Sequence, residues 1–293
     1  MSKSRVADRI YKYLTAAFGA GTIIFIVAAA AVLVFAAYPS IRVNGLEFLT
    51  KTTWNPNLSG NVVTVNGFQT LSGSSYGILV FVADTLASSA IAVLLAVPAG
   101  LGIAIFLTQI APRKVAAPIS LLVEMLAGIP SVIYGFWGLV VLGPYLLLHL
   151  EPFLSQHLSF IPIFSGPVYS PGLLAAGIIL AIMVVPIIAS ISRDMMTKTP
   201  NELKEGAKAL GLTRWEVTRK VVLPFAKTAI FGSIILGLGR ALGETMAIAM
   251  LSGAGVQQLP TSLYYPASTV AAFMVLSLNG ALSDPSGMGV SAL

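Results

Sequence analysis

The composition of the chain is that of a protein surrounded by lipid. Of its 293 residues, 56% are hydrophobic and only 10% are charged, and the mean hydropathy is +0.89, whereas about a quarter of the residues of a soluble domain are charged. The absence of Cys excludes disulfides, thiol catalysis and Cys-based zinc or iron–sulfur sites. The net charge of +6 comes without a nucleic-acid recognition motif, and the basic residues flank apolar segments. We therefore assign the positive charge to membrane topology and expect no nucleic-acid partner.

The residues that carry enzymatic chemistry are also missing from the sequence. The two histidines, His149 and His157, have no partner at a metal-ligand spacing, so we expect both in a polar loop. No Ser nucleophile motif or nucleotide-binding loop occurs. The sequence thus predicts a protein that is not an enzyme, with no metal and no cofactor. Any ATP hydrolysis is expected in a separate subunit.

Five apolar segments are predicted to cross the membrane, because each can span a hydrocarbon core of about 30 Å. The basic residues before the first segment place the N-terminus in the cytoplasm. They also resemble the start of a secretory signal, but the apolar run that follows is longer than such signals carry. The third segment is too long for one perpendicular span, and Gly128, Pro130 and Gly135 mark where it could break. The predicted spans are residues 15–38, 77–110, 115–150, 172–192 and 228–251.

The segments between the spans differ in charge, and this difference predicts their sides of the membrane. Residues 39–76 are polar and contain the turn signal Asn66-Gly67, so we expect an outer loop, whereas residues 193–227 are rich in Lys and Arg and are expected in the cytoplasm. Residues 267–278 are too short to cross and are expected to be interfacial or re-entrant. The organisation predicted is a cytoplasmic N-terminal segment, 1–14, and one transmembrane domain, 15–293.

The cytoplasmic loop is predicted to contain a short helix between Pro200 and Gly211. Proline suits the first turn of a helix and glycine suits its C-terminal stop. Leu203, Ala207 and Leu210 would then share one face. Such a helix could lie on the membrane surface or fit into a groove on a soluble partner.

A longer pattern favours the partner. This pattern resembles the cytoplasmic signature of binding-protein-dependent ABC importer permeases. It consists of Glu205-Gly206-Ala207, then Gly211 after three residues, then Val221-Val222-Leu223-Pro224 after nine. Gly206 and Val221 replace the commoner Ala and Ile. In that family this segment is the coupling helix, which inserts into a groove on the ATPase subunit. The resemblance implies that ATPase coupling involves Leu203, Glu205, Gly206, Ala207, Leu210, Gly211, Leu223 and Pro224.

Charged residues inside predicted spans are the candidates for a translocation path. Arg240 and Glu244 are four residues apart and would project from one helical face, either as a structural ion pair or as part of the path. Glu124 is a third candidate, with Arg240 as its expected nearest cation. The Gly-Ile-Pro-Ser131 break frees backbone groups, which lipid would not tolerate, and so it favours a lining position for Ser131. Asp84 is expected to be merely interfacial.

Two stretches, from Glu124 to Gly135 and from Gly239 to Thr245, closely resemble phosphate-specific ABC importer permeases, with a long outer loop like that of the C-type subunit. The resemblance implies an all-α membrane bundle of the type I, MetI-like class, with the family's final span missing from a truncated product. It also implies a second, A-type permease, an ATP-binding subunit dimer, an extracytoplasmic phosphate-binding protein and a bacterial or archaeal plasma membrane. The sequence leaves open another oxyanion (molybdate, sulfate or phosphonate) or a signalling subunit that senses phosphate without moving it.

Overall fold

The computed structural model describes residues 2–168, 171–251 and 257–293; the side chains of residues 2–7 and of Arg113 lie outside this description. The chain divides into two compact units, the first formed by Met1–Gly77 with Leu278–Leu293 and the second by Ile78–Ser277. Within the described residues, five helical stretches are long and apolar enough to cross a membrane: Asp8–Asn44, Leu79–Ile110, Ser131–Leu158, Leu173–Thr197 and Arg214–Leu242. The predicted number of spans is confirmed.

The first unit joins a long helix to the folded outer loop. Helix α1 (Ser2–Asn44) is followed by α2 (Glu47–Thr50). Strand β1 (Trp54–Asn55) pairs antiparallel with β4 (Ser75–Tyr76), and β2 (Val62–Val65) pairs with β3 (Phe68–Leu71). The predicted Asn66-Gly67 turn closes the β2–β3 hairpin, with φ of 51° and 85°. Two successive positive φ values are those of a type I′ turn, the commonest two-residue hairpin connection.

The C-terminal helix α14 (Met288–Ala292) is fixed in the same unit by polar contacts. The buried carboxylate of Asp284 accepts hydrogen bonds from the Tyr76 hydroxyl (3.3 Å) and from the backbone N–H of Gly289 (2.7 Å). Ser291 donates to the carbonyl of Ala36 at 2.9 Å and accepts from the N–H of Ser40 at 3.1 Å. Residues far apart in sequence therefore hold α14 to the end of α1 and to the β1–β4 hairpin.

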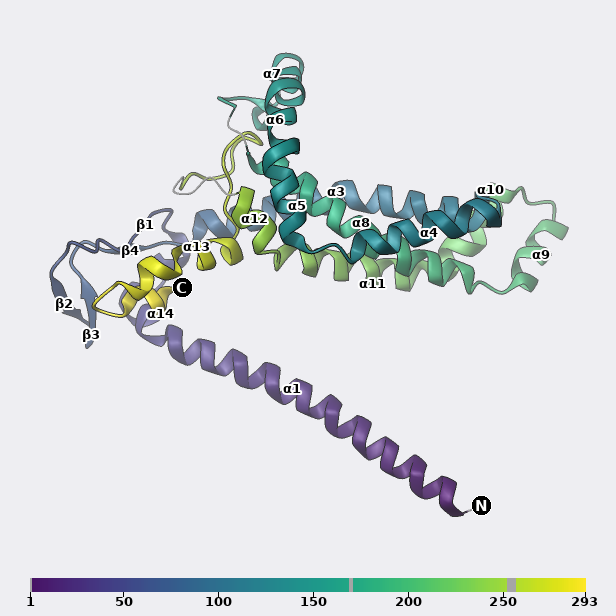
Figure 1. The fold of residues 1–293 in the computed structure, drawn as a ribbon, viewed down its shortest axis with the longest axis horizontal. Coiled ribbons are helices and arrows are strands. Elements are labelled where there is room, and N and C mark those ends of the chain that lie inside the picture. Colours follow the sequence, from purple (N-terminus) through teal and green to yellow (C-terminus); the bar gives the residue numbers. More distant parts are fainter. Residues whose placement is uncertain (1, 169–170, 252–256) are drawn as a thin grey trace. The chain divides into compact units, whose positions relative to one another are not determined.

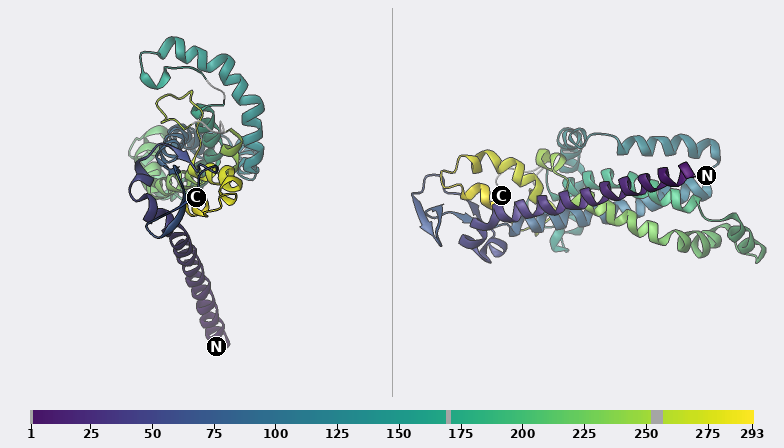
Figure 2. Two further views of the ribbon diagram at one scale, coloured as in Figure 1. Left: turned by 90° about the vertical axis from the view of Figure 1, so that its left-hand side faces the viewer. Right: turned by 90° about the horizontal axis from the view of Figure 1, so that it is seen from below.

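The second unit is a helical bundle. Helices α3 (Leu79–Ile105), α8 (Leu173–Thr197) and α11 (Leu223–Leu242) lie side by side, and α4 (Arg113–Ala127) runs along them (Figures 1 and 2). Small side chains such as Ala92 and Ala96 form the core with Val184 and Ile188. Such residues allow backbones to approach closely, which is how membrane helices associate without a hydrophobic driving force.

The predicted break in the third segment is confirmed. Helix α4 ends at Ala127, and α5 (Ser131–Trp137) begins beyond Pro130 and turns away from the bundle direction (Figure 1). Short helices α6 (Gly143–Tyr145) and α7 (Glu151–Leu158) continue this arm. His149 and His157 lie in it, stacked on Tyr145 and Phe153, so their expected place in a polar loop was wrong. The run is helical because its prolines occupy first-turn positions, where no N–H is required.

Wide π-helical turns precede four prolines. The turns span Phe106–Ile110, Gly138–Leu142, Leu146–Leu150 and Thr218–Val222, and each ends two residues before Pro112, Pro144, Pro152 or Pro224. A proline ring clashes with the carbonyl four residues earlier and supplies no N–H to it. The wider turn changes the hydrogen-bond partners there, which lets three of these helices continue through a proline.

The remaining elements connect the bundle. A 3-10 turn (Pro162–Phe164) precedes α8, and α9 (Asn201–Ala209) with α10 (Arg214–Val217) join α8 to α11 at one end of the bundle (Figure 1). Toward the other end lie α12 (Met246–Leu251) and α13 (Val270–Leu282), a helix of 13 residues in the apolar stretch predicted to be too short to cross.

Candidate functional site

The predicted cytoplasmic helix is present as α9, with both of its predicted ends. Pro200 precedes the first helical residue, and Gly211 has a φ of +86°. The N–H of Leu212 bonds to the carbonyl of Ala207 at 3.2 Å, and the N–H of Gly211 bonds to that of Lys208 at 2.9 Å. This pair of bonds is a Schellman motif, which requires a left-handed residue at the position of Gly211. The chain therefore makes a fixed corner after α9.

The apolar residues of α9 do not form one exposed stripe. Leu203 is 50% exposed and Leu210 is 82% exposed, whereas Ala207 is only 9% exposed. Helix α9 packs against α10 and the π-helical turn beyond it, so Ala207 is buried within its own chain. Glu205 and Gly206 lie on the exposed part of the helix. The large apolar side chains left for a partner are Leu203, in the first turn of α9, and Leu210, directly after its last residue.

The corner leads into a helix that starts earlier than the proline predicts. Thr213 and Glu216 form a capping box: the Thr213 N–H donates to Glu216 Oε2 at 2.9 Å, and the Glu216 N–H donates to Thr213 Oγ1 at 3.3 Å. From Arg214 the chain is helical through Leu223 and Pro224 to Leu242. Leu223-Pro224 thus lies inside a continuous helix rather than at its start.

Glu124 has a different partner from the one expected. Its Oε1 accepts from Arg193 Nη2 at 2.8 Å, and the same guanidinium bonds Asp194 at 2.8 Å. The expected pairing with Arg240 was wrong because α4 packs along α8, which carries Arg193 near its C-terminal end. Arg193 was predicted at the start of the cytoplasmic loop, although it directly follows an apolar run and could have been assigned to the helix. Glu124 and Arg193 join α4 to α8.

Arg240 and Glu244 do not lie on one helix. Helix α11 ends at Leu242, the chain turns through Gly243, and the Glu244 carboxylate accepts from the N–H of Ala247 at 3.3 Å, at the start of α12. Glu244 is buried, whereas Arg240 is exposed and forms no ion pair with any residue in the described part of the chain. The prediction of a shared helical face was wrong, because Gly243 allows the helix to end between the two residues.

Helices α5 and α12 bring three of the candidate residues into one region. An added Cβ at Gly135 would lie 2.7 Å from the Cα of Ala247, so glycine is required for this close approach. Tyr134, beside it on α5, donates a hydrogen bond to the carbonyl of Leu126 at 2.8 Å and lies within electrostatic reach of Arg240. Ser131 is half-buried at the start of α5. Ser131, Arg240 and Glu244 therefore belong to this junction, and Glu124 belongs to a separate ion pair.

Asp84 is a buried residue with a structural hydrogen bond. It is 1% exposed, and its carboxylate accepts from the N–H of Ser268 at 2.9 Å. The neighbouring Thr85 accepts from the N–H of Val270 at 2.9 Å. Together they satisfy backbone N–H groups at the start of α13, which otherwise lack helical partners. The adjacent acid and hydroxyl were the available sequence signal for a capping role.

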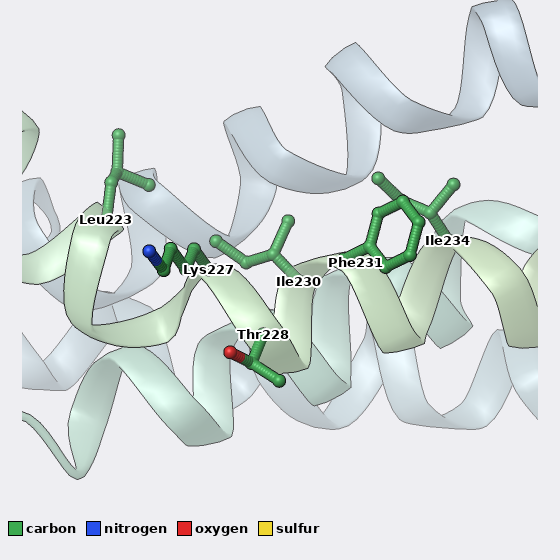
Figure 3. Close-up of a pocket in the computed structure, with 6 residues that line it drawn as sticks. All are labelled: Leu223, Lys227, Thr228, Ile230, Phe231 and Ile234. Carbon is green, nitrogen blue, oxygen red and sulfur yellow. The ribbon is translucent and has the colours of Figure 1, made fainter.

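A groove of about 520 Å³ runs along α11 and is distinct from the junction (Figure 3). Its lining is almost entirely apolar, and it contains one charge, Lys227, and one hydroxyl, that of Thr228. A phosphate group needs several donors around it, so this groove lacks the chemistry of an anion path. The lining residues are Leu223, Lys227, Thr228, Ile230, Phe231 and Ile234.

Comparison with known families identifies the family of this chain. Residues 96–282 match the model of the family described as binding-protein-dependent transport system inner membrane component. The chain belongs to this family. The family is a membrane subunit without enzymatic activity, as the sequence predicts, and the ATPase activity belongs to a separate nucleotide-binding subunit. Membership also implies an ATP-binding subunit and a substrate-binding protein as partners, and a multi-pass protein of the inner membrane.

Relatives within the family share most of the chain. The phosphate transport system permease protein PstC 1 of Mycobacterium tuberculosis is 41% identical over 265 residues, which cover 89% of this chain and 78% of the relative. PstC of Xylella fastidiosa is 42% identical, covering 92% and 79%. PstC of Haemophilus influenzae is 41% identical, covering 98% and 86%. The predicted resemblance is confirmed.

A solved structure of the methionine ABC transporter MetNI, in an inward-facing conformation, is also similar. It is 20% identical, with a TM-score of 0.48, and the match covers 71% of this chain and 82% of that chain. The family match and the five candidate spans, without this likeness, confirm the predicted permease fold class, which is mostly helical.

Proposed function

We propose that this chain is the C-type transmembrane subunit of an ATP-driven importer that moves inorganic phosphate into the cytoplasm. The observation that carries the proposal is the fixed α9–α10 corner, which bears the importer signature at one end of the bundle. The relatives named above are phosphate permeases at about two-fifths identity over most of the chain, which supports phosphate as the transported anion.

Arg240 is the residue that we assign to the anion. It is exposed at the end of α11 and has no carboxylate partner among the described residues, since Glu244 is occupied at the start of α12. An unpaired guanidinium in a path of low dielectric lowers the barrier for an oxyanion. Glu244 keeps α12 in place and limits how tightly the anion binds. Ser131 lines the same junction, and Glu124 positions α4.

The assembly that we propose contains this chain, an A-type permease, two copies of an ATP-binding subunit and an extracytoplasmic phosphate-binding protein. ATP binding closes the two motor subunits, and α9 transmits the displacement to the helices. Residues 1–14 and 193–227 then face the cytoplasm, and residues 39–76 face outward. The high content of Lys and Arg in 193–227 supports this orientation.

Uptake of ³³P-labelled phosphate into proteoliposomes that contain the whole assembly tests the proposal. We expect ATP-dependent uptake of the label that unlabelled phosphate suppresses. Equal concentrations of molybdate, sulfate or phosphonate should change the uptake rate by no more than about twofold. Little uptake of labelled phosphate, with ATP-dependent uptake of one of those anions when that anion carries the label, would indicate a permease for that oxyanion. ATP hydrolysis without uptake of any anion would indicate a signalling subunit.

A further inference from the structure

The groove along α11 has a positive charge at one end and an apolar wall along the rest. Its volume of about 520 Å³ lies in the range of sites for small molecules, and all of its lining residues belong to α11. Lys227 extends its amine toward the Leu223 end of the groove, and Ile230, Phe231 and Ile234 follow in the other direction (Figure 3). This layout matches a molecule with a polar head and an apolar tail.

The groove lies within one leaflet of the membrane. Residues 228–239 carry no charge, so the hydrocarbon layer begins directly beyond Lys227. From Lys227 to Ile234 the helix rises by about 10 Å, which is less than half of a hydrocarbon core of about 30 Å. A lysine near the end of a membrane helix extends its amine to the headgroups while its carbon stem stays on apolar surface. The amine is therefore at the level of the headgroups, and the apolar wall is at the level of the acyl chains.

The lining residues favour a lipid over another helix as the occupant of the groove. Helices that pack against each other in a membrane have small residues at the contact, which allow the backbones to approach closely. The apolar lining of this groove consists of Phe231, which is 65% exposed, and three branched aliphatic side chains. A flexible acyl chain can fill the irregular space between such large side chains, whereas a second helix cannot approach them closely.

The charge of Lys227 determines which headgroup the groove prefers. The side chain is exposed, and its amine forms no ion pair with any side chain that the structure describes. A single amine cannot enclose a free phosphate ion, which needs several donors. It can attract the phosphate of a lipid that the apolar wall already holds by its chain, and anionic lipids are present in the cytoplasmic leaflet.

We propose that the α11 groove binds an anionic phospholipid, with the lipid phosphate at Lys227 and one acyl chain along Ile230, Phe231 and Ile234. This inference takes the cytoplasmic side of Lys227 from the orientation proposed above, but it does not depend on which anion is transported. The site lies between the α9–α10 corner and Arg240, so the lipid contacts the helix that joins them.

Fluorescence quenching by brominated lipids tests the proposal at the groove itself. The whole assembly, with Phe231→Trp in this chain, is placed in phosphatidylcholine nanodiscs that contain increasing fractions of dibrominated phosphatidylglycerol or dibrominated phosphatidylcholine. The fluorescence of the wild-type assembly in the same nanodiscs is subtracted. We expect phosphatidylglycerol to bind about fivefold more tightly than phosphatidylcholine, which corresponds to the about 1 kcal/mol that one lysine near an anionic surface contributes.

Variants of the lysine separate a headgroup site from general contact with lipid. Added to Phe231→Trp, Lys227→Ala should abolish the preference for phosphatidylglycerol, and Lys227→Arg should retain it within about twofold. The matched control is Lys114→Ala, which removes another exposed lysine, at the start of α4 and outside the groove, and should leave the preference unchanged. Phe25→Trp, on the exposed surface of α1, should show no preference between the two lipids.

Two results of the quenching experiment would contradict the inference. Equal quenching by the two lipids in Phe231→Trp would show that the groove does not select a headgroup, and no quenching by either would show that protein covers it. If Phe231→Trp does not assemble, native mass spectrometry of the otherwise unchanged assembly counts the bound phosphatidylglycerol. The count should fall by one per copy of this chain on Lys227→Ala and not on Lys114→Ala, and an unchanged count contradicts the inference. Neither assay contains phosphate or ATP, so their failure leaves the proposed function in place.

Discussion

The charged residues that the sequence analysis assigned to one translocation path have separate roles in the structure. Arg240, Glu244 and Glu124 appeared there as one intramembrane set. In the structure, Glu124 bonds Arg193 and Glu244 holds the start of α12, and Arg240 remains for the anion. The difference arises from two structural features that no local sequence pattern predicts. Helix α11 ends before Gly243, and α4 packs along α8.

Replacement of Arg240 by Ala should reduce phosphate uptake at least about 100-fold. An arginine in a membrane helix costs about 2.5–3.5 kcal/mol on insertion scales, so its removal should not impair insertion. Uptake is measured alongside the amount of chain in the membrane, with Arg240→Lys as the charge-conserving control. Uptake at the wild-type rate by the Ala variant would remove Arg240 from the path.

Asp284 should make the first unit sensitive to acid. Burial raises the pKa of Asp284, but hydrogen bonds from Ser286, Gly289 and Tyr76 outweigh it and hold this pKa below its ordinary value. A lowered pKa stabilises the fold above the ordinary value, about 3.9, and this stability is lost as the pH falls through the folded-state value. The protection of the Gly289 amide, which is the ratio of its intrinsic exchange rate to its observed rate at the same pH, should therefore fall only below about pH 4.

The matched variant for this residue is Asp284→Asn. Its amide group turns a donor toward the N–H of Gly289 or leaves that N–H without a charged acceptor, at a cost of about 1–3 kcal/mol. Exchange at the Gly289 amide should be faster than in the wild type at pH 7. Its protection, relative to the intrinsic exchange rate at each pH, should change little on acidification. Equal exchange rates in the two proteins at pH 7 would show that the carboxylate contributes nothing to this unit.

At the scale of elements, the turns and caps were the most predictable features. Pro200, Gly211 and Asn66-Gly67 each determine a local geometry by their own backbone restrictions, and each lies where the sequence places it. The burial of Asp84 and Ala207 was not predicted, because their surroundings come from α13 and from α10, which are remote or unpredicted in the sequence. Local conformation was readable, and burial by distant elements was not.

Substitutions at two glycines of the coupling segment should have different effects on ATP hydrolysis. Gly211 has a φ of +86°, which costs a side-chain-bearing residue about 1–2 kcal/mol, so Gly211→Val should distort the corner. We expect it to lower the ATP hydrolysis that the binding protein stimulates by at least about fivefold. Gly206→Ala should leave hydrolysis unchanged, because nothing lies within 4 Å of the added Cβ and alanine favours helix. Equal effects of the two changes would contradict the role of the corner.

For the whole molecule, composition and charge predicted the lipid solvent and the five spans, because these depend on sums over many residues. The family was predicted from the resemblance of short motifs, such as the stretch from Glu205 to Pro224. The continuation of the third span beyond residue 150 was not predictable in this way. The two histidines were expected in a polar loop, but wide helical turns before Pro144 and Pro152 keep the arm formed by α5 to α7 helical. The architecture places the α9–α10 corner on the connection between α8 and α11, so a displacement of the corner acts directly on two bundle helices.

The most direct test compares phosphate uptake before and after α9 is made unable to engage the motor. Proteoliposomes contain the complete assembly, with wild-type chain or with Leu203→Glu, and ATP inside. The binding protein and ³³P-phosphate are added outside, and the amount of permease is matched. We expect ATP-dependent uptake by the wild type and its loss in the variant. Uptake at the full wild-type rate by a variant whose α9 no longer binds the motor would contradict the account.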